Sequence, residues 1–109
     1  KERRLQIQQL VEYIQAEIPL SEPLILAGDF NDWRLSCHHY LQQTLQLEEA
    51  HLRTEGALAR TYPARLPLLK MDRIYQRGFQ VNQSKKLVGA DWQPLSDHCA
   101  LLTELELVA

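Results

Sequence analysis

Three short polar clusters carry the residues of this 109-residue chain whose side chains could do chemistry. Asp29 and Asn31 follow one apolar run, Asp72 opens a second run, and Asp97-His98 directly precedes a third. Carboxylate, amide and imidazole groups can orient water, hold a divalent cation and stabilise developing negative charge. Brought together, these side chains could form one site for acid–base or metal-assisted chemistry.

The run Leu24–Ala27 is the element that must position the first cluster. It has no polar alternation, so it predicts a strand that is buried on both faces. The run ends in a polar turn that contains Asp29, Asn31 and Asp32. Open α/β sheets build their sites at such strand ends, so we expect the site there.

Each candidate also has an interpretation that requires no chemistry. Gly, Asn and Asp are ordinary turn residues and could simply end a strand. Asp72 beside Arg73 could form an edge-strand ion pair that contributes little to the stability of the fold. His98 could be a hydrogen-bonded core histidine, and Asp97 after Ser96 could belong to a turn. The placement of all three clusters at strand ends is what favours a site.

Composition is that of an ordinary globular domain. Apolar residues make up 45% and charged residues 24%, and the length allows one domain over residues 1–109. No apolar run reaches the roughly 20 residues that span a bilayer, and no signal-peptide pattern opens the chain. We therefore expect a cytoplasmic protein. Cys99 is expected to be a buried free thiol, with a single bridge to Cys37 as the alternative.

Charge is unevenly distributed along the chain. The net charge is −2 and the pI about 6.1, which argues against a dedicated DNA-backbone binder. Residues 60–86 carry seven Lys and Arg residues against the single acid Asp72, whereas the flanking segments are net acidic. This basic segment predicts either a landing surface for an anionic substrate or solvated residues that oppose aggregation.

Apolar spacing predicts a helix over residues 2–18 that ends at Pro19. A shorter helix is predicted over residues 37–47, with Ser36 as its N-cap. We interpret the adjacent Cys37, His38 and His39 as helix surface, because they are too crowded to hold one ion. The apolar stripe of the first helix can cover one sheet face, and it consists of Ile7, Leu10, Val11, Ile14 and Ile18.

The remaining segments predict strands and connections. Residues 79–88 follow a turn at Gly78 and predict a hairpin partner for the strand before it. The last strand is apolar at its start and alternates apolar and polar residues at its end. We therefore expect its first part to lie centrally in the sheet and its last part to have one face in solvent. Strands are predicted over 60–62, 68–76 and 99–108, and loops over 52–59 and 91–97.

Together the clusters resemble the C-terminal half of the endonuclease/exonuclease/phosphatase superfamily, which has the deoxyribonuclease I-like fold. The motifs are Gly28-Asp29-Phe30-Asn31, Met71-Asp72-Arg73-Ile74 and Ser96-Asp97-His98, and the resemblance covers nearly the whole chain. It implies an α/β fold that is half of a four-layer sandwich, with one mixed, mostly antiparallel sheet and helices on one face. It also implies that residues 1–109 are a piece of a longer protein.

The resemblance implies a role for each matching residue. Asp29 would orient or deprotonate the attacking water, and Asn31 would hydrogen-bond the scissile phosphate or the nucleophile. His98 would bind a non-bridging phosphate oxygen, and Asp72 would hold the tautomer of His98. Asp97, together with Asp29, would lie beside a divalent metal, for which oxygen ligands suit Mg²⁺ or Mn²⁺. Most metal ligands would come from the N-terminal half, which has no counterpart here.

We therefore expect a fragment of a divalent-metal-dependent phosphoester hydrolase, of the phosphodiesterase or nuclease kind, with little activity in the isolated chain. One alternative is a phosphomonoesterase or phospholipase-like enzyme acting on a small phosphorylated substrate. Another is a non-catalytic binding module that retains the fold. The expected partner is a phosphoester substrate, nucleic acid included. The sheet face that the other half would cover is expected to drive self-association.

Overall fold

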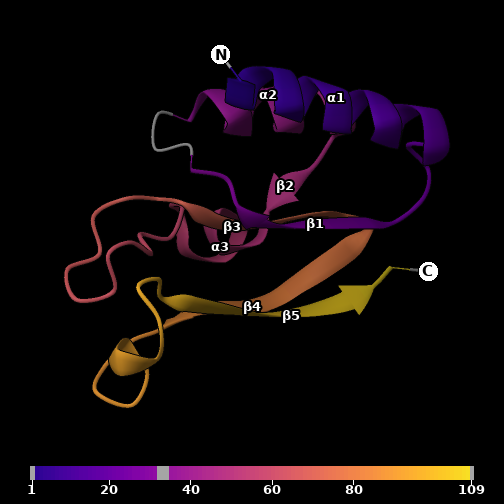
Figure 1. The fold of residues 1–109 in the computed structure, drawn as a ribbon. Helices are drawn as coiled ribbons and strands as arrows, with labels where there is room; N and C mark the ends of the chain where they lie inside the picture. Colours follow the sequence, from indigo (N-terminus) through magenta and orange to yellow (C-terminus); the bar gives the residue numbers. More distant parts are fainter. Residues whose placement is uncertain (1, 32–34, 109) are drawn as a thin grey trace.

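The computed structural model describes residues 2–31 and 35–108, with side chains from residue 6 onward. Strands β1, β3 and β2 form one antiparallel sheet, and β4 and β5 form a second. Helices α1 and α2 lie on one side of β1 and β3, and the β4–β5 pair lies on the other side (Figure 1). The elements are α1 (Glu2–Glu17), β1 (Leu24–Asp29), α2 (Ser36–Leu45), β2 (Glu48–Glu49), α3 (Ala50–Glu55), β3 (Asp72–Arg77), β4 (Phe79–Leu87), η1 (Gln93–Leu95) and β5 (Ala100–Leu107).

This arrangement confirms the predicted α/β class. The described strands are all antiparallel and form two hydrogen-bonded sheets, so the prediction of one mixed sheet is wrong in that detail. Within the described residues, no helix is both long and apolar enough to cross a membrane.

The core lies between the two helices and the β1–β3 sheet. Val11 and Ile14 of α1 are buried against Leu41 and Leu45 of α2, and Tyr75 of β3 completes the cluster on the sheet side. These residues recur at the helical spacing that the sequence shows, which confirms the predicted apolar stripe. Burial raises the pKa of the Tyr75 hydroxyl to about 12, so this group stays protonated in the core.

Strand β1 is not buried on both faces. Leu24 and Leu26 pack against the core, but Ile25 is 49% exposed and Ala27 is also exposed. Because α1 and α2 cover one sheet face only, the alternate side chains of this edge strand face solvent. The same correction holds for the start of β5, where Leu102 is 52% exposed and only β4 is a hydrogen-bonded neighbour.

Gly78 separates two sheets instead of turning a hairpin between neighbours. Strand β4 pairs with β5, so the predicted pairing of residues 79–88 with the preceding strand is wrong. Gly78 has a φ of +84°, and a Cβ there would lie 2.9 Å from Pro23. Only glycine fits this conformation and contact, and the chain leaves the first sheet at this point. A register shift follows between Val81 and Gln83.

Helix α3 occupies residues 52–55 of the loop that the sequence predicts over residues 52–59, and the rest of that loop is confirmed. The carboxylate of Glu49 accepts a hydrogen bond from the Leu52 N–H at 2.8 Å and another from the Ile74 N–H at 2.9 Å. One side chain thus caps the helix and joins it to β3. Burial raises the pKa of the Glu49 carboxyl, and the two hydrogen bonds oppose that shift.

Two smaller predictions about α2 are also wrong. The helix begins at Ser36, with Leu35 at the N-cap position in a left-handed conformation (φ 70°), so Ser36 is not the cap. His38 does not lie on the helix surface, because it is 5% exposed and its Nδ1 lies 3.0 Å from the Tyr75 hydroxyl. His39 is exposed, as predicted.

Two cations of the basic segment are internal. The Arg77 guanidinium is 8% exposed and donates hydrogen bonds to the carbonyl oxygens of Pro19, Glu22 and Leu45. Arg73 is 1% exposed and donates to the Lys70 carbonyl and to the Tyr75 hydroxyl. These two residues therefore belong to the core and cannot contribute to a landing surface for an anionic substrate.

Candidate active site

The pairing of β1 with β3 brings the first two clusters together. In this antiparallel register Asp29 is the partner of Asp72, so the last residue of one strand faces the first residue of the other. Opposed residues of neighbouring strands place their side chains on the same face of the sheet. Two carboxylates from distant parts of the sequence therefore meet at one edge.

His98 joins these two carboxylates. Its Nδ1 lies 2.5 Å from Asp72 Oδ2, and its Nε2 lies 3.7 Å from Asp29 Oδ2. The ring sits directly before β5 and is part-buried, with 29% of its side chain exposed. The structure thus brings together three predicted site residues, one from each motif. Of these, Asp72 and His98 lie within hydrogen-bond distance of each other.

Asn31 and Asp97 are adjacent to this group. The Asn31 N–H donates a hydrogen bond of 2.9 Å to Asp29 Oδ1, and Asn31 adopts a left-handed conformation with φ of 51°. Asp97 is exposed, and its carbonyl oxygen accepts a hydrogen bond from the Ala64 N–H. The roles of their side chains stay predictions. Asp32, the other acid of the first cluster, lies outside the described residues.

The carboxylates determine the charge state of the imidazole. The hydrogen bond to Asp72 raises the pKa of His98, and the charges of Asp72, Asp29 and Asp97 act in the same direction. Partial burial opposes this shift by disfavouring the charged ring. The net effect favours an imidazolium whose Nδ1–H donates to Asp72.

A pH titration checks this assignment. The pKa of His98 in the metal-free protein is expected to lie above 6.5, and Asp72→Asn should lower it, because that variant removes the main cause of the shift. The measurement is an NMR titration of the imidazole C–H resonances. Since the folded state binds the proton more tightly, this pair stabilises the fold fully below pH 6.5, and the stabilisation is lost as pH rises through the folded-state pKa.

The control for that titration is Asp91→Asn, which makes the same change at an exposed loop residue. It should leave the His98 titration unchanged. An unshifted His98 in the unsubstituted protein, or an Asp72→Asn variant with the same titration, would contradict the assignment.

At this edge the exposed carboxylate of Asp29 offers oxygen atoms of the kind that suit a hard divalent cation. Asp29, Asp72 and His98 each offer one ligand atom, and these atoms lie within 4.8 Å of one another. Asp72 and His98 are hydrogen-bonded to each other, whereas Asp29 is an exposed carboxylate. Carboxylate oxygens are the ligands that Mg²⁺ and Mn²⁺ prefer.

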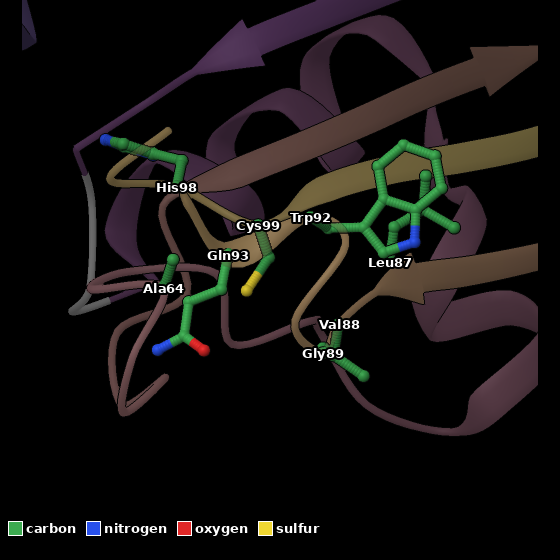
Figure 2. A pocket seen from close by; sticks show the side chains of 8 residues that line it. All are labelled: Ala64, Leu87, Val88, Gly89, Trp92, Gln93, His98 and Cys99. Carbon is green, nitrogen blue, oxygen red and sulfur yellow. The ribbon is translucent and has the colours of Figure 1, made fainter. Parts of the chain in front are cut away.

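Cys99 follows His98 directly in the chain and lies beside the Asp29–Asp72–His98 group. The His98 imidazole and the Cys99 thiol point in different directions from neighbouring positions of the chain (Figure 2). Cys99 lines a small pocket together with His98, Ala64, Trp92, Gln93 and residues 87–89 at and after the end of β4. No disulfide joins Cys37 to Cys99, so the predicted buried free thiol at Cys99 is confirmed and the alternative bridge is not formed.

Two residues beside the Asp29–Asp72–His98 group are not among the predicted site residues. Thr61 and Tyr62 were assigned to a short strand, but the structure shows only an isolated bridge between Tyr62 and Leu69. Tyr62 instead packs against the His98 ring, with the two centroids 4.8 Å apart. No periodicity in the sequence marks these residues, because Tyr62 meets His98 across 36 positions and Thr61 meets Asp72 across 11.

With this geometry in view, comparison with known proteins identifies the family. A sequence profile of the "Endonuclease/Exonuclease/phosphatase family" matches residues 2–98, which is most of the chain. The chain belongs to this family. Its members are generally phosphoester hydrolases that use divalent metals, and the Asp-Asp-His group at the strand ends is consistent with that chemistry.

The chain is also similar to curated proteins and to a solved structure. The chain is 40% identical over 105 residues to "Uncharacterized protein YbhP" of Escherichia coli strain K12, and equally to the YbhP of Shigella flexneri. The alignment covers 96% of this chain and 41% of each relative. A crystal structure of a functionally unknown conserved protein from Enterococcus faecalis V583 matches with a TM-score of 0.76 at 25% identity. That match covers 97% of this chain and 44% of the other.

Proposed function

We propose that this chain is the C-terminal half of the catalytic domain of a divalent-metal-dependent phosphodiesterase. The chain spans about two-fifths of the length of the curated relatives it matches, and we call the longer protein the full-length parent. The observation that carries the proposal is the meeting of Asp29, Asp72 and His98 from three motifs at one edge of the sheet.

In the proposed chemistry, the Asp72–His98 pair and Asp29 have different tasks. Asp72 holds Nδ1 of His98, so Nε2 is the edge of the ring that can reach a substrate, and it lies on the side of Asp29. A protonated imidazole there would donate to a phosphoryl oxygen and stabilise the charge that develops in the transition state. Asp29, with one oxygen held by the Asn31 N–H, would orient or deprotonate the attacking water.

The metal would be held by oxygen ligands beside this group. Asp29 and Asp97 are the residues of this chain that would contribute, with the remaining ligands coming from the N-terminal half. When bound, the cation would supply electrostatic stabilisation of the phosphoryl oxygens. Asn31 would hydrogen-bond the scissile phosphate or the nucleophile.

Hydrolysis of bis-p-nitrophenyl phosphate by the full-length parent tests the proposal. We expect turnover with Mg²⁺ or Mn²⁺ and its loss in excess EDTA, because the cation carries part of the charge stabilisation. The matched substrate control is p-nitrophenyl phosphate, a monoester with the same leaving group. Faster hydrolysis of the monoester would favour the phosphomonoesterase alternative. Full activity in EDTA would exclude a metal requirement. No hydrolysis of either substrate would favour a binding module.

A further inference from the structure

The segment Thr61–Ala64 makes three separate contacts with the residues around the catalytic pair. The Thr61 hydroxyl accepts a hydrogen bond of 3.1 Å from the Asp72 N–H. The Tyr62 ring lies 4.8 Å, centroid to centroid, from the His98 ring. The Ala64 N–H donates a hydrogen bond of 2.7 Å to the Asp97 carbonyl. Thus one short segment touches both members of the pair and the residue next to it.

Thr61 also joins β3, which carries Asp72, to the segment before β5, which carries His98. Its carbonyl oxygen accepts a hydrogen bond of 2.7 Å from the Cys99 N–H, and its hydroxyl holds the backbone at Asp72. Thr61 is fully buried, so neither bond competes with water. The backbone that carries Asp72 and the backbone that carries His98 are therefore fixed to the same residue.

Tyr62 restricts the imidazole from the side. Asp72 holds one ring nitrogen of His98, which leaves the ring free to tilt about that hydrogen bond. The Tyr62 ring packs on the imidazole at an interplanar angle of 48° and limits that tilt. Because the backbone near His98 is bonded to Thr61 and Ala64, this packing surface has a fixed position relative to the ring.

We propose that Thr61 and Tyr62 are positioning residues that hold the Asp72–His98 pair in its reactive geometry. Tyr62 acts through its aromatic ring, which packs on His98, and Thr61 acts through its hydroxyl, which holds the Asp72 backbone. This inference rests on the proposed function for its catalytic consequence, but the geometry of the pair can be measured without turnover.

The test compares Tyr62→Leu, which removes the ring, with Tyr62→Phe, which keeps it, in the full-length parent. For Tyr62→Leu we expect kcat on bis-p-nitrophenyl phosphate to fall roughly 10- to 100-fold with KM within about twofold, because a misplaced group affects the transition state most. Tyr62→Phe should restore kcat. Tyr13→Leu makes the same substitution on the exposed face of α1, where Tyr13 is 65% exposed, and should behave as the unsubstituted protein.

A second readout follows the pair itself. The His98 Nδ1 proton shared with Asp72 should give a low-field NMR resonance that persists in Tyr62→Phe and Tyr13→Leu. In Tyr62→Leu it should broaden or vanish through faster exchange with water. This readout remains valid if the parent shows no hydrolysis, so failure of the proposed function and failure of the positioning role are distinguishable.

For Thr61, the pair of variants is Thr61→Val, which loses the acceptor for the Asp72 N–H, and Thr61→Ser, which retains it. We expect the low-field resonance and kcat to be lost in the first and kept in the second. If Thr61→Val does not fold, as judged by circular dichroism, the Tyr62 variants decide the proposal. An unchanged kcat and resonance in Tyr62→Leu, or an equal loss in Tyr62→Phe, would overturn it.

Discussion

We expect Asp29→Asn and His98→Gln each to lower kcat of the full-length parent by about 10²- to 10⁴-fold, the range for a group that moves a proton or stabilises charge in the transition state. Asparagine at position 29 retains an oxygen that can accept the Asn31 N–H but lacks the negative charge. Glutamine at position 98 removes the imidazole that Asp72 holds. The measurement is bis-p-nitrophenyl phosphate hydrolysis with saturating Mg²⁺.

Matched controls separate this effect from general damage. Asp91→Asn and His39→Gln make the same chemical changes at exposed positions, on the loop before η1 and on α2. Both should retain activity within about twofold, because surface changes away from a site have small effects. Near-unchanged activity in both site variants, with the fold intact by circular dichroism, would remove Asp29 and His98 from the mechanism.

The second large effect concerns the isolated 109-residue chain, for which we propose self-association into a dimer. Its accessible surface is 7296 Å², compared with about 6,200 Å² for a compact monomer of 12.7 kDa. Part of the excess is apolar, since Ile25 on β1 and Leu102 on β5 are each about half exposed. A second copy could cover these strands and remove apolar surface from water.

Sedimentation velocity over a range of concentrations tests this proposal. The weight-average mass should rise from 12.7 kDa towards the dimer value with concentration. The double substitution Ile25→Lys and Leu102→Lys should keep the chain monomeric, because it places charge on the exposed strands. Tyr13→Lys, a matched change on α1, should leave the association unchanged. A monomer at all concentrations, or equal association of the double variant, would contradict the proposal.

Local features of this protein follow from its sequence alone. The helix α1 and its buried stripe at Val11 and Ile14 follow from apolar spacing, because a helix repeats its face every three to four residues. The clusters at Asp29, Asp72 and His98 are recognisable because polar residues adjoin apolar runs at strand ends. Residue types and short-range order were enough to indicate the α/β class, and the resemblance of three motifs to a known family indicated phosphoester hydrolysis.

Other predictions failed because they depend on which surfaces meet. The pattern of residues 79–88 predicts a strand but does not specify its partner. The chain leaves the first sheet at Gly78, where a side chain would collide with Pro23, and β4 pairs with β5. Arginine is usually a surface residue. The Arg77 guanidinium is nevertheless buried, because it donates hydrogen bonds to three backbone carbonyls near the ends of α1 and α2.

The candidate site divides in the same way. The sequence determined which groups are available at the strand ends, since that depends on neighbouring residues in the chain. Only the tertiary structure decided that Asp29 lies opposite Asp72, that His98 is held between them, and that Thr61 and Tyr62 support the pair. These contacts join residues far apart in sequence, and their geometry depends on strand register and loop packing, which no local pattern encodes.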